Sequence, residues 1–106
     1  GLTRSMARDF GPQGVRVNCV CPGWIRTPMA DEEMQPLMAH YHESLDDAYA
    51  RVTQHVPLRR PASAHEIAEV CHFLISPASA IITGSMIMAD GGSHIVDTPT
   101  LAFEAL

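Results

Sequence analysis

The residues most able to hold a metal are the six histidines, two of which lie in an acidic stretch. His40 and His42 precede Glu43, and imidazole and carboxylate groups are common zinc ligands. Ligands on one helix must be three or four residues apart to share a face, whereas residues two apart diverge by about 200 degrees. We therefore expect no metal site. The other histidines are expected to be solvated or paired with neighbouring side chains.

The three cysteines could serve as thiol ligands or redox groups. Cys19 and Cys21 are two apart in a segment with strand character, which places both on one face without forming a C-x-x-C pattern. Cys71 lies on an apolar helical stripe. We expect all three to be buried, reduced thiols, and a metal or redox role is the alternative.

Turn residues divide the first part of the chain into a helix and a strand. Apolar residues at four-residue spacing predict a helix over residues 2–10, which Gly11-Pro12 ends. Alternating apolar residues predict a strand from Val15 to Cys21, which Pro22-Gly23 ends. A helix joined to a strand by a short link is half of a right-handed crossover unit, so we expect a parallel sheet.

The last part of the chain contains the same kinds of element. Ser63 and Glu66 form a capping box that predicts a helix ending near Ser76. The almost wholly apolar run from Ser85 to Ala89 predicts a strand that is buried on both faces. The alternation of helices and strands indicates an α/β fold.

The stretch from Val15 to Met29, VRVNCVCPGWIRTPM, runs the predicted strand into a Pro-Gly turn and a Thr-Pro segment. In that order it resembles the part of the short-chain dehydrogenase/reductase family that closes over the nicotinamide end of NAD(P). The resemblance extends from the first residues, GLTRS, to Asp90-Gly91-Gly92. It implies that residues 1–106 are the C-terminal part of one Rossmann-type domain with a doubly wound parallel sheet.

Other functional residues of the resembled family have no counterpart in this chain. Those enzymes bind the dinucleotide with a Gly-rich turn and move protons with a Ser and a Tyr-x-x-x-Lys pair. This sequence has no lysine, and Tyr41 and Tyr49 are followed four residues later by Leu45 and Thr53. We therefore expect no catalytic residue here, and the chain resembles a severed half of an enzyme that transfers hydride between NAD or NADP and a secondary alcohol or ketone. The alternative is a non-catalytic truncated fragment or a docking module.

The resemblance places the candidate site at the end of the first strand. Gly23 would let the backbone approach the cofactor, and main-chain groups of Ile25 would bind the nicotinamide carboxamide, which offers one acceptor oxygen and a donor NH2. Thr27 would add a hydroxyl, and a local cap is its alternative role. Simple packing is the alternative for Trp24. The predicted cofactor contacts are Pro22, Gly23, Ile25 and Thr27, and the predicted substrate contacts are Trp24 and Met29.

Residues 29–57, here named the lid, correspond to the family's variable cover over the substrate. Ser44 can cap a helix with apolar residues Leu45, Ala48, Tyr49 and Val52, and an earlier helical turn is expected over residues 33–40. Two interpretations remain open for a further set of lid side chains, which form either an adaptable pocket for substrate or part of the core. These side chains are Met29, Met34, Met38 and Tyr41.

Composition and the resemblance together limit the partners. Twelve acidic residues outnumber seven scattered arginines, so neither nucleic acid nor an anionic membrane is an expected partner. No apolar run approaches 18 residues and the first residues are too polar for a signal peptide, which makes cytoplasmic residence the expectation. Two strands cannot form a stable parallel sheet. We expect the N-terminal half of the same enzyme as a partner, and a homotetramer packed through residues 63–76 and 85–89.

Overall fold

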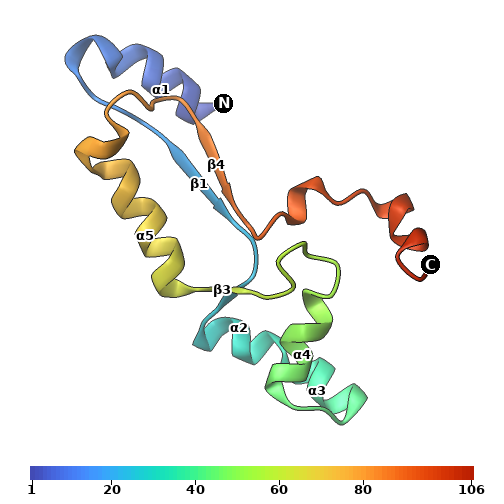
Figure 1. Cartoon of the computed structure of the whole chain (residues 1–106). Helices are drawn as coiled ribbons and strands as arrows, with labels where there is room; N and C mark the ends of the chain where they lie inside the picture. Colours follow the sequence, from blue (N-terminus) through green and yellow to red (C-terminus); the bar gives the residue numbers. More distant parts are fainter.

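The computed structural model describes all 106 residues (Figure 1). The helices are α1 (Leu2–Phe10), α2 (Pro28–Glu33), α3 (Gln35–Tyr41), α4 (Leu45–Val52) and α5 (Ala64–Ile75), and the strands are β1 (Cys19–Pro22), β2 (Ile25–Arg26), β3 (Ala62–Ser63) and β4 (Met86–Ala89). Short 3-10 helices follow α1, α5 and β4. The radius of gyration is 17.5 Å, against about 13 Å for a compact domain of this length. The molecule is therefore extended.

The strands form two parallel pairs. β1 pairs with β4 in a register that runs from Cys19 opposite Met86 to Pro22 opposite Ala89. β2 pairs with β3, with Ile25 opposite Ala62. In Figure 1 the β1–β4 pair runs between α1 and α5, while the lid helices α2, α3 and α4 lie together at one end. The expected α/β class and the parallel sheet are both confirmed.

The first strand begins later than the alternating pattern predicts. Residues 15–18 precede β1 because their backbone bonds a loop instead of a neighbouring strand. The Val17 N–H donates to Thr83 Oγ1 at 3.1 Å, and the Gly84 N–H donates to the Val17 carbonyl at 2.7 Å. The side chain of Asn18 belongs to the same set of bonds, since its amide donates to the Ile82 carbonyl at 3.0 Å. Asn18 is therefore a structural residue that ties β1 to the loop before β4.

The prediction that β4 is buried on both faces is wrong for this chain. Met86 and Met88 are 61% and 43% exposed, whereas Ile87 is half-buried. Alternate residues of a strand face opposite sides of a sheet. Val20, opposite Ile87, lies beside α5 residues in one cavity wall, so the methionines face away from α5. α1 lies on that side of the strand pair but leaves both methionines exposed.

The buried core lies in the lid. Ala30, Met34, Ala48 and Tyr49 form one cluster, and Met38 packs against it. The core interpretation is thus correct for Met34 and Met38, whereas Met29 and Tyr41 are exposed. Ser44 caps α4 in a capping box with Asp47, as predicted. The helix α2 was not predicted, and the expected turn over residues 33–40 corresponds to α3.

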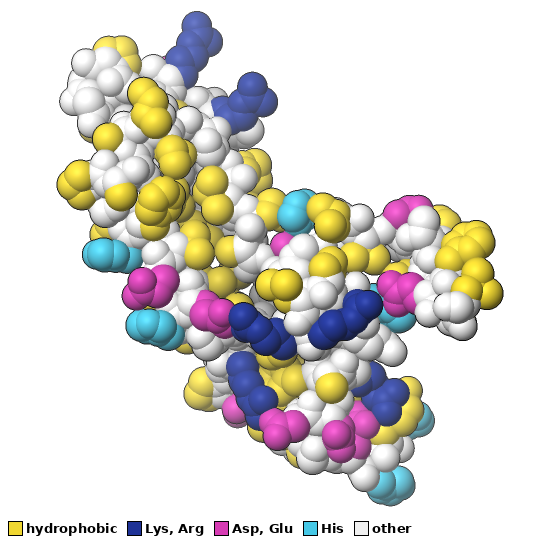
Figure 2. Space-filling view, in the orientation of Figure 1, with side chains coloured by type: hydrophobic (Ala, Val, Ile, Leu, Met, Phe, Trp, Pro, Cys, Tyr) yellow, Lys and Arg dark blue, Asp and Glu magenta, His cyan; other side chains and the backbone are white.

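The surface around α5 is apolar on most sides. This helix has the predicted capping box, with Ser63 Oγ accepting from the Glu66 N–H at 3.1 Å. Figure 2 shows hydrophobic side chains crowded over the α5 and strand region, whereas the lid carries Arg, Asp and Glu side chains. Cys71 on α5 is exposed, which corrects the prediction of a buried thiol, because nothing in this chain packs over that side of the helix.

The thiols of Cys19 and Cys21 are half-buried and lie 3.7 Å apart. Both cysteines are free, and they share the sheet face of Met86 and Met88. No helix of the structure has both the length and the apolar character needed to cross a bilayer.

Candidate functional site

A groove lies between the turn after β1 and the start of α2. Its volume is about 210 Å³, smaller than the range of roughly 300–1,000 Å³ that encloses a small ligand. It is therefore too small to enclose such a ligand by itself. The lining residues are Gly23, Trp24, Ile25, Thr27, Met29, Ala30 and Glu33. Five of the six predicted site residues thus meet at one groove, and the sixth, Pro22, is the last residue of β1 just outside it.

The backbone of Ile25 is directed away from the neighbouring strand. The Ala62 N–H donates to the Trp24 carbonyl at 2.9 Å, and Ala62 is the register partner of Ile25. In a parallel ladder, the residue opposite such a bonded residue points its own N–H and C=O to the other edge. Ile25 consequently offers one donor and one acceptor at the open edge of β2. That pair complements a carboxamide.

Thr27 is the N-cap of α2. Its Oγ1 accepts from the Ala30 N–H at 3.2 Å, and its backbone is extended as a cap requires. A hydroxyl has one donor hydrogen and two acceptor lone pairs. The cap uses one lone pair, which leaves the O–H free to donate. The two roles considered for Thr27, a helix cap and a cofactor contact, are therefore compatible.

Gly23 has a packing reason to be glycine. A Cβ at this position would lie 3.1 Å from the Cβ of Asp90 and 3.3 Å from its Cα. Such a contact is tighter than most Cβ contacts in proteins, so a side chain at residue 23 would require Asp90 to shift by a few tenths of an ångström. Its contribution to cofactor approach stays a prediction.

Asp90 holds together the turn that follows β4. Burial opposes ionisation of the carboxyl group, but hydrogen bonds from the His94 ring, the Gly92 N–H and the Ser93 hydroxyl outweigh it and lower the pKa of Asp90 to about 2. The His94 N–H also donates to Asp90 at 3.0 Å. The carboxylate is thus ionised and fully engaged at neutral pH, and its role is to fix the backbone against Gly23.

The two predicted substrate residues differ in exposure. Trp24 is 38% exposed and Met29 is 71% exposed at the mouth of the groove. Trp24 also lines a second cavity of about 240 Å³ on the other side of the turn, together with Thr53, Arg60 and Asp90. The Trp24 side chain therefore lies between the groove and this second cavity. A contact of Trp24 with substrate stays a prediction.

Ala30 and Glu33 line the groove but were not predicted as site residues. Both belong to α2, and the signal for that helix was present in the sequence. Thr27 followed by Pro28 is an N-cap with proline at the first helical position, a strong helix start. A helix from Pro28 places residues 30 and 33 on one face.

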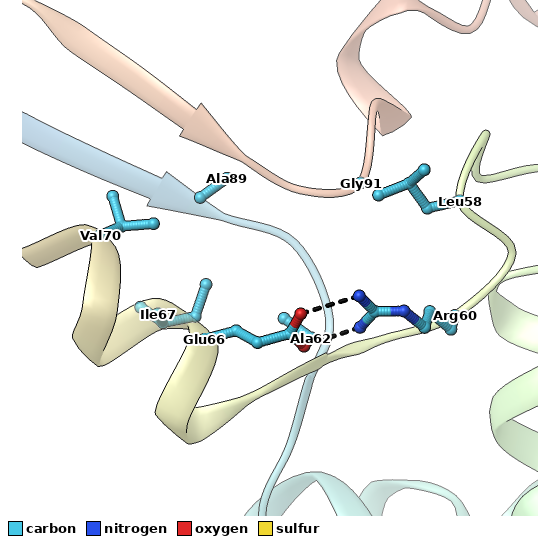
Figure 3. Close-up of a pocket in the computed structure, with 8 residues that line it drawn as sticks. All are labelled: Leu58, Arg60, Ala62, Glu66, Ile67, Val70, Ala89 and Gly91. Carbon is cyan, nitrogen blue, oxygen red and sulfur yellow. Dashed lines mark hydrogen bonds and ion pairs between the residues drawn. The ribbon is translucent and has the colours of Figure 1, made fainter.

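A third cavity of about 160 Å³ lies between α5 and the end of β4 (Figure 3). Ile67 and Val70 of α5 form its apolar wall. Arg60 donates two hydrogen bonds of 2.7 and 2.8 Å to Glu66 at its edge. Those bonds, with one from the Ser63 N–H, lower the pKa of Glu66 to about 2. The cavity includes none of the predicted site residues.

The two tyrosines have different surroundings, and Tyr49 is poorly suited to proton transfer. Tyr49 is 1% exposed, and burial together with a 2.6 Å hydrogen bond to Asp31 raises the pKa of Tyr49 to about 12. The Tyr41 ring contacts the guanidinium group of Arg51, 3.5 Å from the ring centre. A general acid or base needs a pKa near the working pH and access to the substrate. Tyr49 has neither property.

Comparison with known proteins gives the chain a family context. Residues 1–94 match the family model described as enoyl-(acyl carrier protein) reductase. Protein MoaE of Klebsiella aerogenes is 65% identical over 103 residues, which are 97% of this chain and 40% of that protein. A crystal structure of a short chain dehydrogenase family protein from Francisella tularensis superposes with a TM-score of 0.81 at 36% identity, covering 90% of this chain and 39% of that one.

A second solved structure carries ligands. L-sorbose reductase from Gluconobacter frateurii, complexed with NADPH and L-sorbose, superposes with a TM-score of 0.79 at 29% identity, over 86% of this chain and 35% of that chain. The chain therefore spans about two-fifths or less of the length of these relatives.

Proposed function

Because the chain belongs to the short-chain dehydrogenase/reductase family, we propose that it forms the nicotinamide side of an NAD(P)-dependent oxidoreductase. The observation that carries this proposal is the groove at the end of β1, where five residues of the family's cofactor and substrate wall meet. NADPH in the related L-sorbose reductase supports a nicotinamide cofactor. The substrate class is a secondary alcohol or its ketone.

Different residues of the groove bind the cofactor and the substrate. The Ile25 N–H and C=O fix the orientation of the nicotinamide carboxamide, and the free O–H of Thr27 donates to the carboxamide or the pyrophosphate. Pro22 and Gly23 form the backbone wall beside them. When bound, the cofactor supplies or accepts the hydride. Trp24 and Met29 contact the substrate, and the lid excludes water from it.

The remaining functions come from a partner, the N-terminal half of the same enzyme. That half supplies the Gly-rich phosphate turn and the groups that move the proton. The accessible surface of this chain is 7447 Å², roughly 1,600 Å² more than a compact protein of this mass exposes. Its apolar part includes Met86 and Met88, which face away from α5. The N-terminal half packs on that face and completes the sheet.

A second contact forms between copies of the enzyme. α5 is a 12-residue helix with apolar side chains on several sides, among them the exposed Phe73 and Ile75. A helix that is apolar around most of its circumference is normally buried. We propose that α5 and β4 pack against a symmetry-related copy within a tetramer. The three free cysteines favour a reducing compartment such as the cytoplasm.

Production of the chain with and without an N-terminal half tests the proposal. The complete enzyme is expected to bind NADH or NADPH, measured by titration of cofactor fluorescence, and to oxidise or reduce members of a panel of secondary alcohols and ketones. A complete enzyme that binds neither cofactor would refute the proposal. That result would favour the alternative, a non-catalytic docking module.

A further inference from the structure

A partly buried hydrogen bond joins α4 to α2, the lid helix that begins at Thr27 of the candidate cofactor wall. Tyr49 of α4 is 1% exposed, and its hydroxyl donates to Asp31 Oδ1 at 2.6 Å. Asp31 belongs to the first turn of α2. No other side-chain hydrogen bond joins α2 to α4, so this contact fixes the two helices relative to each other.

Asp31 also contacts Thr27 directly. The Asp31 N–H donates to the Thr27 carbonyl at 2.8 Å, one residue beyond the Ala30 N–H that donates to Thr27 Oγ1. Both the carbonyl and the hydroxyl of Thr27 are thus held by the turn of α2 that Tyr49 anchors. A shift of that turn would move the Thr27 hydroxyl.

Arg26 provides a second, weaker connection between the same regions. It lies between Ile25 and Thr27, its guanidinium group is 4.7 Å from the centre of the Tyr49 ring, and it donates to Asp46 of α4. The Arg26 and Asp46 side chains are largely exposed. Exposed ion pairs are screened by water and salt and contribute little. The partly buried Tyr49–Asp31 bond is therefore the stronger of the two polar connections.

We propose that Tyr49 and Asp31 are positioning residues, which hold Thr27 in place and thereby couple the lid to cofactor binding. This inference rests on the proposed function, because it assigns Thr27 a cofactor contact. Neither residue touches the cofactor. Through them, a cofactor that engages Thr27 restrains α2, and α2 restrains α4 of the lid.

Four substitutions distinguish a positioning role for Tyr49 from a purely structural one. Tyr49→Phe keeps the ring in the core and removes only the hydroxyl. Asp31→Asn keeps an acceptor oxygen for that hydroxyl, whereas Asp31→Ala removes it. Glu43→Gln is the matched control, since Glu43 accepts two hydrogen bonds of 2.9 Å from Arg51 of α4 without reaching Thr27.

The experiment uses the complete enzyme and two readouts. One is the dissociation constant for NAD(P)H, and the other is hydrogen exchange of the Ala30 and Asp31 amides with and without cofactor. We expect Tyr49→Phe and Asp31→Ala each to weaken cofactor binding and to speed exchange by about tenfold, the low end for a bond to a charged acceptor. The double variant should be no worse than either single one. Asp31→Asn should stay near the wild type, and Glu43→Gln should change neither readout.

Two contrary results have different meanings. If the wild type binds NAD(P)H and Tyr49→Phe leaves both the dissociation constant and the exchange unchanged, the positioning role is refuted. If the wild type binds no NAD(P)H, the proposed function fails. The exchange of Ala30 and Asp31 still decides in that case whether Tyr49 holds the turn.

Discussion

The lid and the strand region of this chain differ in burial although the proportion of apolar residues is similar in both. Five of the eight buried residues belong to the lid, including Met34 and Tyr49. The strand region contributes only Ala7, Leu74 and Ser79. The lid helices are consecutive in the chain, so they provide each other's packing surfaces. A parallel sheet takes its neighbours from distant segments, and here one face of β4 stays exposed.

The largest effect is expected when the N-terminal half is absent, because the strand region needs this partner and the lid does not. Without an N-terminal half, the chain should bind NAD(P) no more tightly than the millimolar range, about −4 kcal/mol, because the groove is only one wall of a site. It should also aggregate or remain loosely packed around the strands. Calorimetry and light scattering test this. A monodisperse, cooperatively melting monomer with micromolar NAD(P) affinity would show that the strand region needs no partner.

The next effect concerns the core of the lid. In the complete enzyme, Tyr49→Ala should lower the free energy of opening of the lid by roughly 3–5 kcal/mol, the usual cost of removing a buried aromatic ring. Hydrogen exchange of amides in α2 and α4 measures this quantity. Tyr41→Ala is the control, because Tyr41 is an exposed aromatic residue at the end of α3 in the same lid. We expect it to change lid opening far less, and equal effects of both variants would contradict the buried core.

A smaller effect is expected at Thr27, where the lid begins. Thr27→Gly keeps most of the cap, since glycine at an N-cap costs only a few tenths of a kcal/mol. It removes the hydroxyl, whose hydrogen bond to the cofactor contributes about 0.5–1.5 kcal/mol. Cofactor titration should therefore show several-fold weaker binding, with Thr27→Ser near the wild type. Equal affinity of all three proteins would leave Thr27 with a cap role only.

The smallest effects are expected at the extremes of pH, and they differ between the two regions. The pKa of Glu66 is lowered, so its contribution to the start of α5 is present above about pH 4.3, the ordinary value, and is lost as the pH falls towards about 2. The pKa of Tyr49 is raised, so its contribution to the lid is present below about pH 10 and is lost as the pH rises through about 12.

Circular dichroism and amide exchange over the pH range test this pair of limits. Acid should loosen the first turn of α5 while the Tyr49 hydroxyl keeps its proton and its bond to Asp31. Alkali should loosen the lid before it loosens α5. Arg60→Gln serves as the control, because it removes the main cause of the lowered pKa of Glu66 and should move the acid limit to higher pH. An unchanged acid limit in that variant would contradict the ion pair.

Local signals allowed much of the fold to be predicted. The capping boxes at Ser44 and Ser63 start α4 and α5 because both partners of each box lie within one turn. The helix α2 was missed, since Thr27-Pro28 was interpreted as a cofactor segment rather than as a helix start. The burial of β4 was overestimated. An apolar run indicates that both faces of a strand are covered in the complete fold, but it does not show that the covering elements belong to this chain.

The candidate site was predictable where its residues are neighbours in the chain. Residues 22–29 form one continuous segment, from the end of β1 through β2 to the start of α2, so their convergence on a groove follows from their proximity in the chain. Asp90, which limits the space for a side chain at residue 23, comes from the end of another strand. Glu33 depends on a helix that was not expected. No local pattern could place either of them beside the groove.

The register between β1 and β4 has a consequence for how the chain folds during synthesis. Asn18 and Ser85, which bond at the start of the strand pair, are 67 residues apart. At the usual 5–20 residues per second, the ribosome takes roughly 3–13 seconds to deliver β4 after β1. The lid contacts are local and form as soon as α4 emerges, since contacts of short sequence separation form fastest. During those seconds β1 lacks its β4 neighbour beside an already folded helical cluster, and the unpaired edge of this apolar strand is exposed to aggregation.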